Sequence, residues 1–175
     1  MKILIDACVL YPTVLRRLVL GVAEAGAFTP LWSARILEEW ARAAARSGAG
    51  GAVRAEIASL QLAFPEAEIA ANPELEARLD LPDLNDVHVL AAAITGAADE
   101  LLTLNITDFP TRVLARHHIL RRQPDEFLLE NFHADGPVAE VAQRVYAQAL
   151  EDGITMPLRA LLKKSRLPRL GKALG

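Results

Sequence analysis

Cysteine is almost absent from this sequence of 175 residues, in which Cys8 is the single one. One cysteine cannot form an internal disulfide, and it cannot build a zinc site from several thiolates. No apolar run reaches the roughly 20 residues that a membrane-spanning helix needs. The apolar start, "MKILIDACVLYP", contains an acid and lacks the long apolar core of a signal peptide. These absences predict a soluble cytoplasmic protein with no membrane partner.

Several familiar enzyme motifs are missing as well. The sequence has no Walker-type phosphate loop, no Gly-x-Gly-x-x-Gly and no serine nucleophile elbow. An Asp-x-Asp phosphatase is disfavoured because Asp6 is followed by Ala7 and Cys8. The net charge of −3 argues against a generally basic nucleic-acid binder. After Asp152, however, the chain contains only basic charges, which indicates either a solvated tail or an arm that contacts phosphate or a partner.

The composition favours a folded and largely helical chain. Hydrophobic residues make up 52% of the sequence and charged residues 23%, which is enough for a sizeable core. Short apolar runs alternate with segments of helical periodicity, and this alternation predicts an α/β fold with a mainly parallel sheet. We expect strands near residues 2–6, 28–32, 100–104 and 117–120, a weak strand within the loop 65–82, and helices near residues 13–26, 34–47, 52–63, 86–95, 111–117, 124–134, 137–151 and 156–165.

Acidic and amide side chains stand where these elements begin or end. Asp6 ends the first strand, Asp86 opens an apolar helix, and Asn105 and Asp108 follow the strand at 100–104. Ligands of parallel sheets bind outside the carboxyl ends of the strands, where these side chains are expected to meet. Carboxylates gathered in one pocket repel one another unless a cation neutralises them, and Mg²⁺ prefers oxygen ligands. The alternative is that each acid is an ordinary cap or turn residue.

Neighbouring residues are interpreted in the same way. Asp83 is predicted to be a cap or loop residue rather than a ligand. Glu38 and Glu39 lie about 100° apart on their helix, so only one of them can face a given point. His88 follows Asp86 by two positions and is therefore expected to point away from it. The single thiol is expected to pack in the core.

Four segments carry a resemblance to a known family. The stretches "ILIDACVLYP", "SARILEEW", "NDVHVLAAAITGAADELLTLNITDFP" and "PDEFL" resemble the PIN-domain family and, within it, VapC-like proteins. Members of that group include ribonuclease toxins of bacterial toxin–antitoxin pairs. The resemblance covers residues 1–130, and residues 82–110 are its most specific part. It implies a three-layer α/β/α sandwich that hydrolyses RNA with Mg²⁺ or Mn²⁺ held by clustered acids.

The resemblance also assigns roles to individual residues. It implies that Asp6, Asp86 and Asp108 bind the metal, and that Glu39 and Asn105 complete the catalytic set. Asn105 is a departure, because many family members carry Asp at this position. An amide can ligate or orient water but adds no negative charge, so we expect Asp108 to carry the metal on this loop and the affinity for Mg²⁺ to be modest.

The resulting expectation is a metal-dependent endoribonuclease, the toxin of a toxin–antitoxin pair. Implied partners are the RNA substrate, a small antitoxin protein and a second copy in a homodimer. We expect a PIN-like domain over residues 1–135 and a helical extension over residues 136–175, which packs on that domain or projects from it. Two alternatives stay open: a catalytically weak or inactive PIN-like binding or regulatory protein, favoured by Asn105, and an acid-based phosphatase or nuclease acting on DNA.

Overall fold

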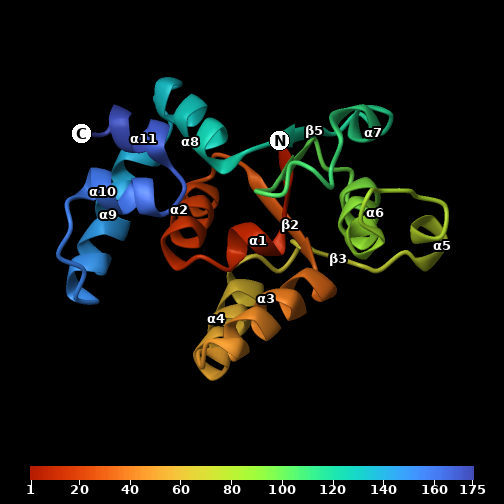
Figure 1. Cartoon of the computed structure of the whole chain (residues 1–175), viewed down its shortest axis with the longest axis horizontal. Helices are drawn as coiled ribbons and strands as arrows, with labels where there is room; N and C mark the ends of the chain where they lie inside the picture. The colour runs from red at the N-terminus through yellow and green to blue at the C-terminus, as the bar shows by residue number, and fades with distance from the viewer. The chain divides into compact units, whose positions relative to one another are not determined.

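The apolar run after Met1 forms the strand β1 (Lys2–Ile5). In this computed structural model, which describes residues 1–175, β1 is the central strand of a five-stranded sheet (Figure 1). The order of the strands is β3-β2-β1-β4-β5. The other strands are β2 (Thr29–Ser33), β3 (Glu68–Ile69), β4 (Glu100–Leu102) and β5 (Leu120–Arg122). β1 is parallel to β2 and to β4, with Leu4 opposite Leu31 on one side and Leu101 on the other, and β2 is parallel to β3. The predicted α/β class with a parallel sheet is confirmed.

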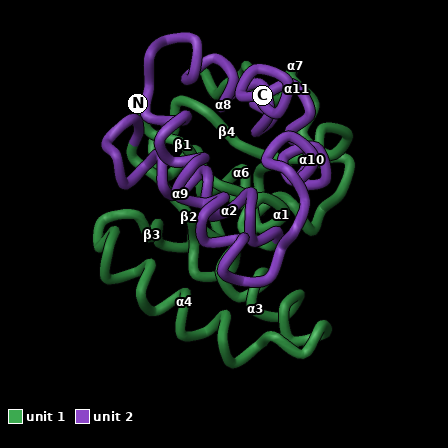
Figure 2. Tube along the Cα trace, turned by 90° about the vertical axis from the view of Figure 1, so that its left-hand side faces the viewer, with its two compact units in different colours: residues 1–11, 29–121 green, residues 12–28, 122–175 purple.

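Contacts divide the chain into two units that are not continuous in sequence. Unit 1 comprises residues 1–11 and 29–121, and unit 2 comprises residues 12–28 and 122–175, green and purple in Figure 2. This division differs from the expected boundary after residue 135. Two helices that precede that boundary, α2 (Thr13–Glu24) and α8 (Pro124–His133), group with the C-terminal helices because they pack against them.

Unit 1 contains the sheet, except for Arg122 at the end of β5, and all the helices between its strands other than α2. These helices are α1 (Ala7–Leu10), α3 (Ala34–Arg46), α4 (Gly50–Ala63), α5 (Pro73–Glu76), the 3₁₀ turn η1 (Leu84–Asp86), α6 (Val87–Thr95) and α7 (Thr111–Ala115). α3 begins where predicted, because Ser33 Oγ accepts a hydrogen bond of 3.2 Å from Ile36 N. α3 packs against α1, α4 and β2, and α6 packs against β1 and β2.

Unit 2 is entirely helical. Besides α2 and α8 it contains α9 (Val138–Glu151), α10 (Leu158–Lys164) and α11 (Pro168–Ala173). α2 approaches α9 so closely that a Cβ at Gly21 would lie 2.6 Å from Val141 Cγ1, which explains a glycine inside this helix. The basic C-terminal segment is not a free tail, because Leu161, Leu162 and Leu170 are buried.

Three short helices were not predicted, and one strand is shifted. α1, α5 and α11 contain four to six residues each, which is too short for hydrophobic periodicity to be recognised. The edge strand begins at Leu120 rather than at His117, because His118 adopts a left-handed backbone conformation with φ 59°. None of the helices combines the length and the apolar character that crossing a membrane requires.

Candidate functional site

Asp6 stands at the carboxyl end of β1 and is held between two elements. Its backbone N–H donates to Leu102 O at 3.1 Å, and its carbonyl accepts from Val9 N at 3.0 Å, so that β1 passes directly into α1. The carboxylate is 7% exposed. Oδ2 accepts hydrogen bonds from Thr103 Oγ1 at 2.7 Å and Cys8 Sγ at 3.0 Å. Both donors fix the orientation of this carboxylate, and Oδ1 takes part in neither bond.

Cys8 therefore belongs to the surroundings of the site and does not simply fill the core. Its Sγ accepts a hydrogen bond of 3.3 Å from Leu104 N while contacting Asp6. Burial, together with the negative charge of Asp6, raises the pKa of the Cys8 thiol to about 12. The thiol thus stays protonated at neutral pH and remains a donor rather than a nucleophile.

Asp83 precedes the 3₁₀ turn η1, and Asp86 is the last residue of that turn. Asp83 caps this turn as predicted, because its Oδ1 accepts from Asn85 N at 2.9 Å and from Asn85 Nδ2 at 3.0 Å. A 3₁₀ helix has three residues per turn, so side chains at i and i+3 lie above one another. The Asp86 backbone N–H donates to Asp83 O at 3.1 Å, and a carboxylate oxygen of Asp83 lies within 4.8 Å of one of Asp86.

The loop after β4 brings an amide and a further carboxylate to the same place. Asn105 N donates to Thr103 Oγ1 at 2.9 Å, which orients the loop. The Asn105 side-chain nitrogen donates to Asp86 Oδ2 at 3.2 Å and to Asp108 Oδ2 at 2.6 Å. Asn105 thus bridges the two carboxylates, and its amide replaces part of the hydration that both lose in the pocket.

Arg121 fixes the far side of this loop. Its Nη1 donates to Ile106 O at 2.7 Å and to Phe109 O at 2.9 Å. Phe109 is fully buried, so the loop is anchored by an apolar contact as well as by the guanidinium. Nothing in the sequence singles out Arg121, because both acceptors are backbone carbonyls.

The electrostatics of the cluster centre on Asp86. One carboxylate oxygen each from Asp83, Asp86 and Asp108 lies within 4.8 Å of the others. Burial and the negative charges of Asp6, Asp83 and Asp108 raise the pKa of Asp86 to about 6, and His88 opposes this shift. Asp83, which the sequence had suggested only as a cap, thus joins Asp86 and Asp108, and Asn105 is hydrogen-bonded to the latter two. Asp6, expected as a third ligand, is not in this group, although its charge acts on Asp86.

Glu39 is not among the clustered acids, and its partners are His88 and Arg35. His88 Nε2 lies 2.9 Å from Glu39 Oε1, and His88 is buried. Neither imidazole nitrogen makes an aligned hydrogen bond. The contact is therefore an ion pair only when His88 is protonated. Arg35 Nε is the second partner of Glu39, at 3.5 Å. His88 of α6 is thus the residue that joins Glu39 of α3 to the helix that begins at Asp86.

The two glutamates of α3 are separated as the helical angle requires. Glu38 faces solvent, where Arg42 Nε lies 3.1 Å from its Oε1 and Arg54 Nη1 lies 3.2 Å from its Oε2. Hydrogen bonds from Arg54 and Arg42 lower the pKa of Glu38. Its charge is thus matched by arginines, and Glu39 is the glutamate directed toward α6.

The donor set fits a hard divalent cation. Mg²⁺ and Mn²⁺ prefer oxygen ligands, and the cluster offers carboxylates from three chain positions within a small space. The closeness of the three carboxylates supports this fit. Burial and the neighbouring acids raise the pKa of Asp86, and a cation would favour its charged form. Asp83, Asp86 and Asp108 are the residues that could hold it.

Comparison with known proteins identifies the family. A family model of the PIN domain matches residues 2–107. The chain belongs to the PIN-domain family. PIN domains are generally metal-dependent nucleases, and the matched range includes Asp6, Glu39, Asp86 and Asn105. No curated protein and no solved structure matches the chain.

Proposed function

We propose that this chain is an endoribonuclease that depends on Mg²⁺ or Mn²⁺ and hydrolyses phosphodiester bonds in RNA. The observation that carries the proposal is the meeting of Asp83, Asp86 and Asp108 within 4.8 Å, in a chain of the PIN-domain family. Exposed acids occur without metals, but these acids come from two separate segments. Burial and the charges of Asp6, Asp83 and Asp108 raise the pKa of Asp86, and shifts of this kind are typical of functional sites.

In this proposal Asp86 and Asp108 hold the metal with Asp83, and Asp6 contributes its charge from the end of β1. When bound, the ion activates a water molecule for attack on phosphorus and offsets charge on the leaving oxygen. Thr103 and Cys8 hold the Asp6 carboxylate in one orientation through Oδ2.

The remaining side chains position the acids. Asn105 spaces the carboxylates of Asp86 and Asp108 by donating to both. Glu39 supports the site from α3, where Arg35 and His88 restrain its carboxylate. Such restraint matters because a loosely held ligand set loses both metal affinity and geometry.

RNA must approach an acidic site, so basic groups at its rim are required. Arg35 and Arg42 of α3 form ion pairs with Glu39 and Glu38 of the same helix. Arg112 on α7 and Arg116 at its C-terminal cap are exposed, and α7 follows the Asp108 loop. We propose them as phosphate contacts near the cleavage site.

The resemblance to VapC-like proteins extends the proposal to a biological role. We propose that the chain is a cytoplasmic toxin whose activity is held in check by a small antitoxin protein, and that it acts as a homodimer. Co-expression with the protein encoded by an adjacent short reading frame tests this role. A toxin gains a stable complex and loses ribonuclease activity, whereas an independent nuclease keeps its activity.

The activity itself is tested on the purified full-length chain with a fluorescent single-stranded RNA and added Mn²⁺ or Mg²⁺. We expect cleavage that EDTA stops and that Asp86→Asn and Asp108→Asn each reduce by about a hundredfold or more. Glu66→Gln removes one exposed carboxylate elsewhere in unit 1 and should leave the rate unchanged. Undiminished cleavage by both Asp variants would refute the proposed site.

A binding protein without catalysis is the second candidate, favoured by the neutral Asn105 between two acids. Calorimetric titration with Mn²⁺ separates the two. The nuclease binds the ion in a manner that Asp86→Asn abolishes, whereas a scaffold that has lost its site shows no binding that depends on these carboxylates.

A further inference from the structure

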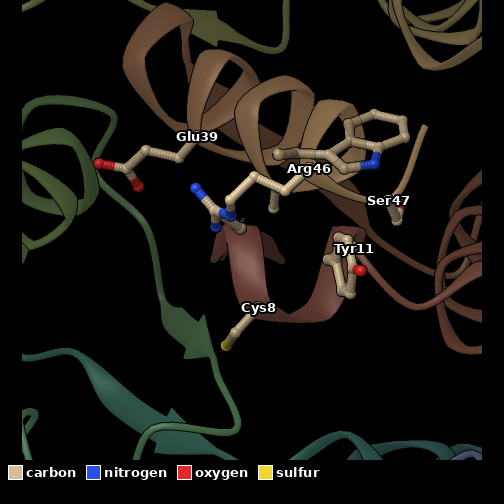
Figure 3. A pocket seen from close by; sticks show the side chains of 8 residues that line it. Cys8, Tyr11, Glu39, Arg46 and Ser47 are labelled. Carbon is tan, nitrogen blue, oxygen red and sulfur yellow. The ribbon is translucent and has the colours of Figure 1, made fainter. Parts of the chain in front are cut away.

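A pocket opens between α1 and α3 (Figure 3). It has a volume of about 480 Å³, which lies in the range of small-ligand pockets. Ala7, Cys8 and Tyr11 line it from the α1 side, and Glu39, Ala43 and Arg46 line it from α3. All of these residues belong to unit 1.

The sequence of α3 explains why this space exists. Glu39, Ala43 and Arg46 occupy positions i, i+4 and i+7, which fall on one face of an α-helix. The residue in the middle is an alanine, and Ala7 stands on the opposing helix, so neither side fills the gap. A long side chain of a helix leans toward its N-terminus. Accordingly, Figure 3 shows the guanidinium of Arg46 reaching back toward Glu39.

Arg46 differs from the other arginines around this helix. Arg42 and Arg54 are paired with Glu38, and Arg35 is paired with Glu39. No ion pair of the structure includes Arg46, although its side chain is exposed and borders the pocket. A guanidinium that is not engaged by a carboxylate is available to an anion, and its planar donors suit a phosphate group.

The pocket adjoins the acids through Cys8. This residue lines the pocket and also donates its S–H to Asp6 Oδ2 at 3.0 Å. A single residue thus connects the pocket to the Asp6 carboxylate at the end of β1. Tyr11, 44% exposed, supplies an aromatic ring at the far end. Arginine and an exposed aromatic ring are the pair of groups with which proteins bind single-stranded nucleic acid.

We propose that the α1–α3 pocket binds a nucleotide adjacent to the cleaved bond of single-stranded RNA, with Arg46 on its phosphate and Tyr11 stacked on its base. This inference rests on the proposed ribonuclease function and names its substrate class. A base can reach Tyr11 only when it is unstacked, which a strand permits and an A-form duplex does not. The site therefore selects single strands.

The test measures affinity separately from cleavage. Full-length protein carrying Asp108→Asn is titrated with a fluorescein-labelled octaribonucleotide, and anisotropy gives the Kd. Adding Arg46→Gln should weaken binding by about tenfold and make the dependence of log Kd on log salt shallower by about 0.7, the value for one phosphate contact on a single strand. Tyr11→Ala should weaken binding by about tenfold, and Tyr11→Phe, which keeps the ring, by less than about twofold.

Arg78→Gln is the matched control, because it removes an exposed arginine of unit 1 outside the pocket. Equal losses for Arg46→Gln and Arg78→Gln would reduce the effect to overall charge and overturn the proposal. So would an unchanged Kd for Arg46→Gln, the result expected if a protein segment rather than RNA occupies the pocket. A duplex bound as tightly as the single strand would also overturn it. Cleavage by the protein without Asp108→Asn is scored separately, so failure of the nuclease function is distinguishable from failure of this subsite.

Discussion

The side-chain nitrogen of Asn105 lies 2.6 Å from Asp108 Oδ2. The same nitrogen also reaches Asp86, so a neutral amide separates two acids that would otherwise repel each other. Asn105, which stands where the family resemblance led us to expect Asp, thus has a structural role. It holds the loop and α6 together in the protein without metal, and it adds no ligand charge.

Asn105→Asp should lower the stability of the metal-free protein and raise its affinity for metal. The new carboxylate cannot donate to either acid and adds negative charge, so we expect the free energy of unfolding in EDTA to fall by about 1–2 kcal/mol, a decrease in Tm of about 3–6 °C. Mn²⁺ affinity should rise by about tenfold, measured by calorimetry. Gln143→Glu, an exposed amide-to-acid change on α9, should alter neither quantity. Unchanged affinity would mean that residue 105 is remote from the ion.

Asp86→Asn should stabilise the protein in EDTA at pH 8. The pKa of Asp86 is raised to about 6, so the folded state binds this proton more tightly than the unfolded state, and ionisation lowers stability as the pH rises from about 4 to above 6. A shift of this size corresponds to about 3 kcal/mol, but the carboxylate is partly exposed, and we expect about 1 kcal/mol.

This gain from Asp86→Asn should vanish at pH 4, where Asp86 of the unmodified protein is protonated when folded. Thermal unfolding at the two pH values measures the difference. Added Mn²⁺ should raise the Tm of the unmodified protein and not that of the variant. A variant less stable than its parent at pH 8 in EDTA would show that burial and repulsion do not disfavour the charged form of Asp86 in the folded protein.

Arg121→Lys should loosen the loop that carries Asp108. Lysine keeps the charge but cannot reproduce the planar donor that reaches both Ile106 O and Phe109 O. Hydrogen exchange of the amides at residues 104–110 should become faster, and Mn²⁺ affinity should fall by about tenfold, as for other supports of metal ligands. Arg112→Lys, on the exposed side of α7, should leave exchange in this loop unchanged. If the amides of residues 104–110 stay protected from exchange in Arg121→Lys, the burial of Phe109 alone holds the loop in place.

Much of this arrangement could be predicted from local sequence. The apolar run before Asp6 predicts β1, Ser33 predicts the start of α3, and the block at 82–110 predicts an acid at the start of α6 and another after β4. These features depend on residues close together in the chain, where propensity and capping decide the outcome.

Features that depend on tertiary packing could not be predicted. Asp83 joins Asp86 because the intervening residues form a 3₁₀ turn rather than an α-helix, and the sequence is compatible with both. Residues 12–28 separate β1 from β2 in the chain, yet they pack with the C-terminal helices. This packing requires a glycine at position 21, because Val141 lies against it. Arg121 acts on backbone carbonyls, which leave no pattern in the sequence.

The contact of His88 with Glu39 belongs to the same class and can be measured directly. A double-mutant cycle of His88→Ala and Glu39→Gln, followed by denaturant unfolding at pH 6, should give a coupling of about 0.5–3 kcal/mol, the range for residues in contact. Because the two atoms are 2.9 Å apart and His88 is buried, we expect the coupling free energy of this pair to exceed that of an exposed ion pair. A parallel cycle of Arg42→Gln and Glu38→Gln serves as the exposed reference and should give about 0.2–1 kcal/mol. Coupling no larger than that reference would mean that His88 packs beside Glu39 without restraining it, and that Glu39 is positioned by Arg35 alone.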